Sequence, residues 1–554
     1  MAGLLTAPTA AVRLLPAAPR LLARAAAPAV GMAAGAAAST ARAGVRGADT
    51  AARVARVARN AFPGAGTHWR SGARAHLAVR PLERDQARRA GGTAHLARRV
   101  AEALREHPEV LVAYWDQGLA RLVVTATGEE AADRVLAHAA DLAERHGLAL
   151  AGGDDAETTH PADPAGVRAA AATLAADAVG IAVALTAYTL RLPPSPRMVT
   201  AVVTLLRENP RFRDRLRARL GDSGMDLALA CANAAVHGAG QSPTSLVLDG
   251  VLRACQVAET VARSAAFDAV HDRLCAPQRV SLAPDGPPRP PLRVSPAQEY
   301  AAHASAGSVL GAAATLLVKH DTAEAAEAVL AGSPKAARYG PAAFHAVLSG
   351  ALARTGVLVR APERLRQLEM AGTVVLHPGA LRTEDGEPDP WAEPVLDAAR
   401  RAGLRVVLVD DPALEDFTGL ADQVVDARRP LDDVVYEARG EEGAVLVVAR
   451  VRTAGEHDVL AALRAADIAL ALSDRNGAVV WGADLLALHG LPDVWRVLTA
   501  IPAARRVGRR AQTLARSGAA LSGLLVAVGE SGGGRGRRAV LPGLRHAPVD
   551  AGAA

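Results

Sequence analysis

The chain has 554 residues, enough for three or more domains, and half of them are hydrophobic, which gives a mean hydropathy of +0.12. This value is high for a soluble protein, so a membrane contribution is expected. All basic residues except Lys319 and Lys335 are arginines, and the net charge is only +6. Such a small charge, without a basic patch interleaved with aromatic residues, argues against nucleic-acid binding.

The three cysteines, Cys231, Cys255 and Cys275, are far apart and lie in or near apolar segments. Their spacing matches no metal motif. Buried free thiols in a reducing compartment are therefore expected.

Residues 1–72 form a basic extension rich in alanine and arginine. Within it, residues 51–62 place Val54, Val57 and Phe62 on one side of a helix, which is typical of a helix on a membrane surface. A poorly ordered extension of biased composition is the favoured interpretation. No clear cleavage site follows.

Residues 73–150 predict a small ferredoxin-like α+β domain. The expected elements are a strand at 75–79, a helix at 93–105, strands at 110–114 and 120–125, and a helix at 129–146. Its histidines could bind a metal, but scattered histidines are more often exposed or core residues, so the metal ligands stay unknown. These histidines are His76, His95, His107, His138 and His146.

Residues 165–352 predict a membrane region with several transmembrane helices. The clearest span is 169–190, where Asp177 is the only charge across a length sufficient for the bilayer core. Asp177 is either a contact between helices, which is favoured, or a residue of a transport pathway. A second span is expected at 301–318.

Three further apolar segments of this region are interrupted. Residues 198–206 lead into a basic stretch typical of an interfacial helix. The segments 227–236 and 244–252 form a broken pair that carries Asn233, His237 and Asp249 and could line a site or be two packed half-spans. In 323–352, the sequence Ser333-Pro334-Lys335 predicts a break, because proline unwinds a helix.

Residues 353–490 predict a doubly wound, Rossmann-type α/β sheet, because near-continuous apolar strands alternate with helices. The expected strands are 373–376, 405–409, 423–425, 444–449 and 468–472, and the expected helices are 362–369, 391–402, 411–420 and 456–465. Residues 491–554 predict a basic helix at 491–516, an apolar stretch at 519–528 too short to span a membrane, and a glycine-rich tail. Such an ending suggests either a piece of a longer protein or a natural protein that ends before its membrane region is complete.

The stretch 353–383, ARTGVLVRAPERLRQLEMAGTVVLHPGALRT, resembles the junction in P-type cation-transporting ATPases where a membrane helix leads to the phosphorylated DKTGT loop. RRAGLRVVLVDDP and AALRAADIALAL resemble later segments of the same family. The chain looks like the degenerate N-terminal half of the long actinobacterial cation-transporting ATPase I type. This resemblance implies a haloacid-dehalogenase-like (HAD-like) phosphorylation domain at 353–490, a heavy-metal-associated-like domain at 73–150, and a multi-pass protein of the cell membrane.

The motifs of the family are not intact. His377 stands where the phosphorylated aspartate is expected, within the degenerate loop His377, Pro378, Gly379 and Thr383. The GDGxND motif is reduced to residues 454–458, and the TGES loop is absent. Only 26 residues separate Thr383 from Asp410, too few for a nucleotide-binding domain. Asp410 and Asp458 remain as weak candidates for cofactor binding.

The sequence therefore favours a catalytically degenerate membrane module with a structural or regulatory role in cation transport. Membrane lipid, and an intact P-type ATPase unit or the missing C-terminal half of the protein, are its expected partners. The alternatives are an active, divergent P-type ATPase, which would need Mg²⁺ and ATP, and a HAD-like phosphatase. The transported ion cannot be read from the sequence.

Overall fold

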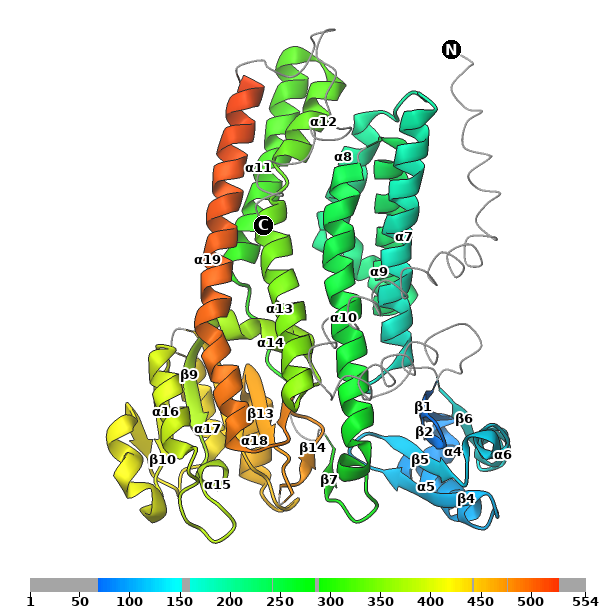
Figure 1. Ribbon diagram of the computed structural model, residues 1–554, viewed down its shortest axis with the longest axis vertical. Coiled ribbons are helices and arrows are strands. Elements are labelled where there is room, and N and C mark those ends of the chain that lie inside the picture. The colour runs from blue at the N-terminus through cyan, green and yellow to red at the C-terminus, as the bar shows by residue number, and fades with distance from the viewer. Residues whose placement is uncertain are drawn as a thin grey trace, which may run out of the picture.

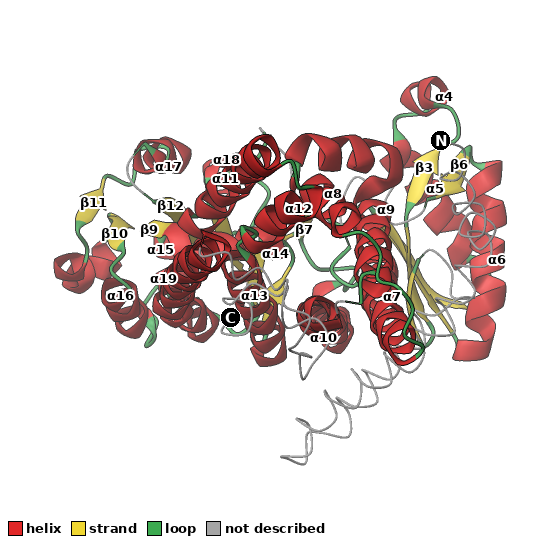
Figure 2. Ribbon diagram, turned by 90° about the horizontal axis from the view of Figure 1, so that it is seen from above, coloured by secondary structure: helices red, strands yellow, loops and turns green. Residues whose placement is uncertain are grey.

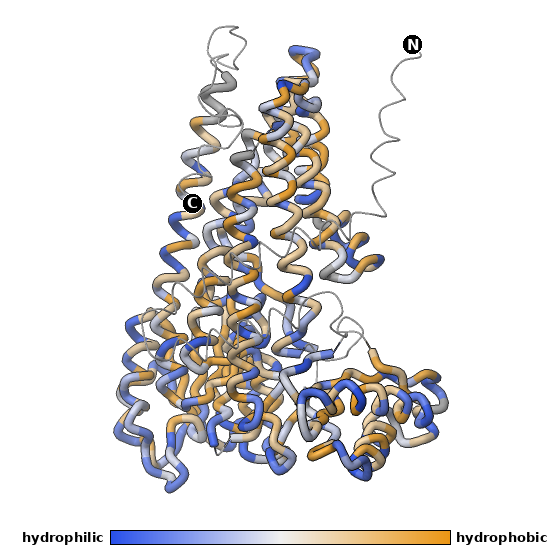
Figure 3. The backbone as a smooth tube through the Cα atoms, turned by 45° about the vertical axis from the view of Figure 1, so that its right-hand side comes forward, coloured by the Kyte–Doolittle hydropathy of each residue, from blue (hydrophilic) through white to orange (hydrophobic). Residues whose placement is uncertain are grey.

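The computed structural model describes residues 68–151, 160–241, 243–283, 288–440, 443–475 and 477–527. The helix considered at 51–62 and the glycine-rich tail lie outside these ranges. In Figure 1 a bundle of long helices stands above two parts that contain β-sheets. Figure 2 shows these two parts on opposite sides of the bundle, and in Figure 3 hydrophobic residues follow much of the upper helices.

The smaller part is an antiparallel sheet in the order β1-β2-β5-β4, covered by two helices. Its strands are β1 (Trp69–Ser71), β2 (Arg74–Leu77), β4 (Val110–Asp116) and β5 (Arg121–Ala126), and its covering helices are α5 (Thr93–Arg105) and α6 (Glu129–Arg145). All five predicted elements are present within a few residues. The sequence did not predict α4 (Arg84–Arg89) or the pair β3 (Val79–Pro81) and β6 (Leu148–Leu150).

The bundle consists of α7 (Pro164–Thr189), α8 (Arg197–Glu208), α9 (Pro210–Ala239), α10 (Pro243–Leu274), α11 (Pro296–Lys319), α12 (Thr322–Ala331), α13 (Lys335–Thr355) and α19 (Leu491–Ala527). In the described part of the chain, two helices, α7 and α11, are long and apolar enough to cross a membrane. They correspond to the two predicted spans, 169–190 and 301–318, although α7 ends one residue earlier, at Thr189. The combination of α/β content with membrane-type helices is thus confirmed.

The bundle packs closely where small residues face each other. A Cβ atom added to Gly180 of α7 would lie 2.9 Å from the carbonyl oxygen of Ala234, and one added to Gly238 would lie 3.1 Å from the carbonyl oxygen of Gly180. Glycine and alanine at such a crossing let helix backbones approach, as in many membrane bundles.

Two helix boundaries bear on the predictions. The predicted break between residues 323 and 352 is present, because α12 ends at Ala331 and α13 begins at Lys335 after Pro334. The predicted end at residue 516 is wrong, since α19 continues to Ala527. The short apolar stretch is therefore the continuation of the basic helix, and the pair at 227–236 and 244–252 belongs to the longer helices α9 and α10.

The larger sheet has seven strands in the order β11-β10-β9-β12-β13-β15-β8. They are β8 (Val357–Val359), β9 (Ala371–Leu376), β10 (Arg405–Val409), β11 (Gln423–Val425), β12 (Ala444–Ala449), β13 (Ile468–Leu472) and β15 (Leu485–Ala487). All neighbours are parallel except β15 and β8. Four of the predicted strands have their observed bounds, and three of them, β10, β12 and β13, are apolar runs buried on both faces of the sheet.

Helices cover both faces of this sheet. They are α14 (Pro362–Leu365), α15 (Pro378–Leu381), α16 (Ala392–Arg401), α17 (Leu431–Arg439) and α18 (His457–Ala465), with 3₁₀ segments at Arg366–Met370 and Pro412–Leu420. The segment expected as a helix at 411–420 is thus a 3₁₀ helix, and α17 was not predicted. A separate pair joins β14 (Val479–Val480) to β7 (Ser281–Leu282), which follows α10.

Gly356 connects the bundle to the larger sheet. It ends α13 with a φ of 106°, and its neighbour Val357 begins β8. A Cβ atom here would lie 2.1 Å from the His489 ring. Glycine is therefore required by both backbone conformation and space.

We expect Gly356→Ala to lower the free energy of unfolding by more than about 1 kcal/mol. Gly386→Ala is the matched control, because Gly386 has a φ of 85° with nothing within 4 Å of an added Cβ. Thermal unfolding in detergent should show a larger loss at position 356. Equal losses would mean that contact with His489 contributes nothing.

Candidate functional site

The predicted site residues gather at the carboxyl edge of the larger sheet. His377 follows β9, Asp410 follows β10, and Asp458 lies in the first turn of α18 after β12. The strands are parallel, so their carboxyl ends share one edge of the sheet. The strand order reverses between β9 and β12, because β10 lies on one side of β9 and β12 on the other. Ligands of doubly wound sheets bind at such a switch point.

His377 closes the loop after β9 rather than presenting a reactive group. Its backbone N–H donates to the carbonyl of Val448 at 3.0 Å. Its Nδ1 accepts a hydrogen bond from the N–H of Gly379 at 3.2 Å and caps α15, in which Pro378 is the first residue. Burial lowers the pKa of His377, although the carboxylates of Asp458 and Glu456 oppose this shift. The imidazole is therefore neutral at pH 7, and it does not replace the carboxylate of the aspartate expected at this position.

The predicted residues His377, Asp410 and Asp458 share this edge but are not joined by hydrogen bonds in the described part of the chain. The side chains of Asp410 and Asp458 are exposed. The Thr383 hydroxyl donates to the carbonyl of Glu387 at 3.2 Å within its own turn. Among the described residues, no recorded hydrogen bond joins His377, Asp410 or Asp458 to one another.

Arg450, which sequence reasoning missed, occupies the switch point. It directly follows β12, and its Nη1 donates to the carbonyl oxygens of Gly379 at 2.8 Å and Arg382 at 2.6 Å. Its Nη2 lies 2.7 Å from Oδ2 of Asp474. Arg382 in turn pairs with Asp411 at 2.9 Å. The guanidinium of Arg450 thus ties the loop after β9 to Asp474 at the switch point.

A second polar cluster lies inside the helical bundle around Asp249 of α10. The buried Asp249 carboxylate accepts hydrogen bonds from Arg207 at 3.2 and 3.3 Å, from Asn233 at 2.8 Å and from the Tyr339 hydroxyl. These donors belong to α8, α9 and α13, so one carboxylate joins four helices. The sequence had singled out Asn233 and Asp249 but not Arg207 or Tyr339.

Glu208, next to Arg207 on α8, is held in the same way. It pairs with Arg338 and accepts hydrogen bonds from the hydroxyls of Ser305 at 2.8 Å and Ser333 at 3.0 Å. Ser333 comes from the break between α12 and α13. The carboxylates of Glu208 at the end of α8 and Asp249 near the start of α10 are therefore both paired with arginines.

A cavity of about 400 Å³ opens beside these groups. His237 and Lys335 line it, and Lys335 Nζ donates to the hydroxyl of Ser245 at 2.9 Å. Asp177 is buried in α7, and its Oδ2 atom has no hydrogen-bond partner among the described residues. The structure thus records no polar contact for that oxygen, and the two interpretations of Asp177 stay open.

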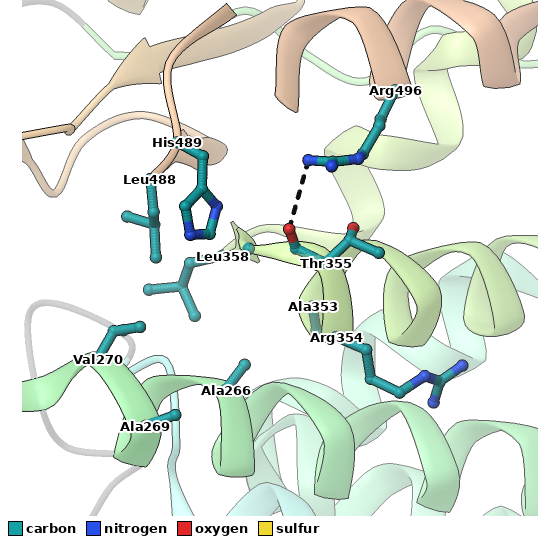
Figure 4. Close-up of a pocket in the computed structure, with 11 residues that line it drawn as sticks. Ala266, Ala269, Val270, Ala353, Arg354, Thr355, Leu358, Leu488, His489 and Arg496 are labelled. Carbon is teal, nitrogen blue, oxygen red and sulfur yellow. Dashed lines mark hydrogen bonds between the residues drawn. The ribbon is translucent and has the colours of Figure 1, made fainter. Parts of the chain in front are cut away.

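Figure 4 shows a third feature, a cavity of about 510 Å³ where the bundle meets the larger sheet. Apolar side chains of α10, Ala266 and Val270 among them, form one wall. Arg496 on the other side donates to the carbonyl of Thr355 at 3.4 Å and also pairs with Asp493. Arg354 and His489 also line this cavity, and none of the predicted site residues does.

No family model matches the chain. It is 28% identical over 590 residues to the "Probable cation-transporting ATPase I" of Mycobacterium tuberculosis, in strains CDC 1551 / Oshkosh and H37Rv, with 83% of this chain covered. The Mycobacterium leprae protein of the same name is also 28% identical, over 592 residues and 84% of this chain. The predicted resemblance to cation-transporting ATPase I is confirmed. The chain spans 36% of the length of these relatives.

Solved structures similar to parts of this chain include two of a zinc-transporting PIB-type ATPase, in different states. One gives a TM-score of 0.37 at 12% identity and covers 66% of this chain and 91% of the other. The second, in the E2.Pi state, gives 0.29 at 14% identity and covers 42% and 59%.

We expect Arg450→Met to destabilise the protein by about 1–3 kcal/mol, because two carbonyl oxygens and Asp474 lose a charged donor. Arg452→Met, two residues further on at an exposed position, should change stability by less than about 0.5 kcal/mol. Denaturation monitored by circular dichroism compares them. If the two variants unfold alike, Arg450 does not support the switch point.

Proposed function

We propose that the chain is a membrane module of a cation-transport ATPase system that does not itself turn over ATP and serves a structural or regulatory role. The observation that carries this proposal is the occupation of both candidate sites by the chain's own arginines. Arg450 fills the switch point of the sheet, and Arg207 neutralises the central carboxylate of the bundle. The similarity to cation-transporting ATPase I over most of the chain supports the connection with cation transport.

The proposal divides the chain in the way that the resemblance suggests. Residues 353–490 are a HAD-like phosphorylation-domain remnant without a nucleotide-binding insert, and residues 73–150 are a degenerate, ferredoxin-like heavy-metal-associated domain. Residues 165–352 are a membrane region without an actuator domain. The strand order around β9 and the antiparallel sheet covered by α5 and α6 support the first two assignments.

Arginines fix the segment between α10 and α11, where the family resemblance implies an actuator domain. Arg289 pairs with the buried Asp484 at 2.7 Å, and Arg293 lies 3.3 Å from the buried Asp467. Both carboxylates also accept backbone N–H groups of the larger sheet. A short connection bound to that sheet supports the assignment of a membrane region without an actuator domain.

The proposed location is the cell membrane, with several spans. Apolar side chains on α11 are widely exposed, including Leu310 at 72%, Leu317 at 75% and Val318 at 80%. On α7, Val183 and Leu185 are also exposed. Apolar surface of this kind along long helices is what lipid would cover. Membrane lipid is accordingly a proposed partner, and an intact P-type ATPase unit, or a further part of the same protein, is the other.

The bundle supports a module that does not carry cations. A carboxylate inside a membrane bundle is costly and is usually part of an ion pathway or paired. Asp249 and Glu208 are paired with Arg207 and Arg338, and Lys335 adds a positive charge beside the cavity. Arginine stays protonated at any accessible pH, so these built-in cations would compete with a transported one.

One observation favours the alternative of a divergent, active ATPase. Asp177 keeps a buried oxygen without a hydrogen-bond partner among the described residues, which a bound cation could satisfy. Asp410 and Asp458 are exposed at the edge of the sheet, and such an enzyme would have to use them for Mg²⁺ and ATP.

The test is ATP turnover by the purified chain in detergent with Mg²⁺ and a panel of cations. We expect neither turnover nor an acid-stable phosphoprotein, from the wild type or from His377→Asp, since a restored aspartate would still lack an intact phosphate-binding loop and a nucleotide-binding insert. A pump with an intact DKTGT loop serves as the positive control. Robust turnover by either form of this chain would refute the proposal.

The bundle gives an independent prediction. Arg207→Met should destabilise the protein by about 3 kcal/mol, because Asp249 would remain as a buried charge without its cation. The double variant Arg207→Met, Asp249→Asn should recover much of this loss. Arg217→Met, at an exposed ion pair of α9, is the control and should have little effect. A wild-type melting temperature for Arg207→Met would show that Asp249 does not depend on this pair.

A further inference from the structure

The small sheet domain is attached to the lower end of α10 by several polar contacts. Ser71 donates to Asp268, Arg74 pairs with Asp272 at 2.8 Å, and the Tyr114 hydroxyl donates to the carbonyl of Cys275. Figure 1 shows this end of α10 beside β2 and β5. Residues of the two parts therefore share one buried interface.

We propose that His76, His271 and Cys275 form a binding site for a borderline divalent metal ion, for which Zn²⁺ is the natural probe, within this interface. The three side chains are buried, with exposures of 1%, 3% and 5%. One ligand atom of each, imidazole nitrogen or Sγ, lies within 4.8 Å of the others. The inference rests on this geometry and is independent of the proposed function.

The backbone brings these ligands to one point. His271 and Cys275 are four residues apart at the end of α10, so both lie on the same face of the helix. His76 comes from β2 across the interface, and its Nε2 lies 2.8 Å from Nε2 of His271. Ligand atoms of a tetrahedral zinc site, with bonds of about 2.0–2.3 Å, are separated by about 3.3–3.8 Å. A small outward movement of the two rings would therefore admit an ion.

The outer contacts suit a metal site at His271. Its Nδ1 lies 3.0 Å from Oδ1 of Asp272 and 3.3 Å from Nη1 of Arg74, while its Nε2 points toward His76 and is the atom that would bind an ion. A carboxylate that orients a histidine ligand in this way is common at zinc sites. Trp69 stacks on the His271 ring at 5.1 Å, and the buried Phe267 lies beside it, so bulk water is excluded.

Binding of an ion to His76 would change hydrogen bonds that this residue makes without an ion. The N–H of Ala162 donates to Nδ1 of His160 at 3.1 Å, and Nε2 of His160 lies 3.0 Å from Nδ1 of His76. Without an ion, this arrangement forms a continuous chain of hydrogen bonds that ends at Asp272. When His76 binds an ion through Nε2, its Nδ1 holds the proton, and His160 has to reorient and give up one hydrogen bond.

The donor set selects the ion. Two imidazole nitrogens and a thiolate suit Zn²⁺ and other borderline or soft ions, whereas Mg²⁺ and Ca²⁺ require oxygen ligands. Three protein ligands leave one position of a tetrahedral site for water or a further ligand. An ion bound here would join β2 to α10 and so fasten the small domain to the bundle.

The experiment uses the purified full-length chain, stripped with a chelator and titrated with Co²⁺ and Zn²⁺. We expect about one ion per chain, a thiolate-to-cobalt charge-transfer band that Zn²⁺ abolishes, and a higher melting temperature with Zn²⁺. Cys275→Ser should lose the band and His76→Gln should lower affinity at least about tenfold. Asp272→Asn should lower affinity by about 10- to 100-fold.

Matched controls separate the site from other thiols and imidazoles. Cys255→Ser lies on the same helix, and His107→Gln lies in the same small domain, yet neither residue is in the cluster. Both variants should keep the wild-type band and affinity. Absence of a charge-transfer band in the wild type would overturn the proposal without any variant. Retention of the band in Cys275→Ser, or its loss in Cys255→Ser, would also overturn it.

Discussion

Burying a carboxylate without a partner is unfavourable, and in this chain arginines pair several of the buried carboxylates. Arg450 holds the loop after β9 and Asp474, while Arg207 and Arg338 hold the two carboxylates of the bundle. The guanidinium group offers several donors in a fixed plane and does not lose its proton. The same kind of group therefore stabilises both the switch point of the larger sheet and the interior of the helical bundle.

The sequence predicted best what depends on local pattern. The strands at 405–409 and 444–449 were found because four or more consecutive apolar residues fit a sheet covered on both faces. Helix α17 could have been found, since Leu431, Val434, Val435 and Ala438 follow helical spacing. The 3₁₀ form of 412–420 could not, because it depends on tertiary context.

In the candidate sites, sequence reasoning failed where contacts join residues that are far apart in the chain. The position of His377 after an apolar strand was readable, and the parallel strands place it beside Asp410 and Asp458 as topology requires. Arg450 was missed because nothing in the local pattern distinguishes it from the exposed Arg452. The approach of His76 to His271 and Cys275, about 195 positions away, depends on how the small domain docks against α10. No spacing rule encodes such a contact.

The bundle and the larger sheet are connected at one edge of that sheet. Helix α13 enters the sheet through Gly356 and β8, and β15 leaves it toward α19. These two strands are adjacent and antiparallel, with Leu486 opposite Leu358, and Figure 1 shows α13 and α19 side by side above them. A movement of either helix therefore acts on the same edge of the sheet. The loop at the carboxyl edge is held separately, by the hydrogen bonds of Arg450 to the carbonyl oxygens of Gly379 and Arg382. The attachment of the bundle and the support of the switch point therefore depend on different residues.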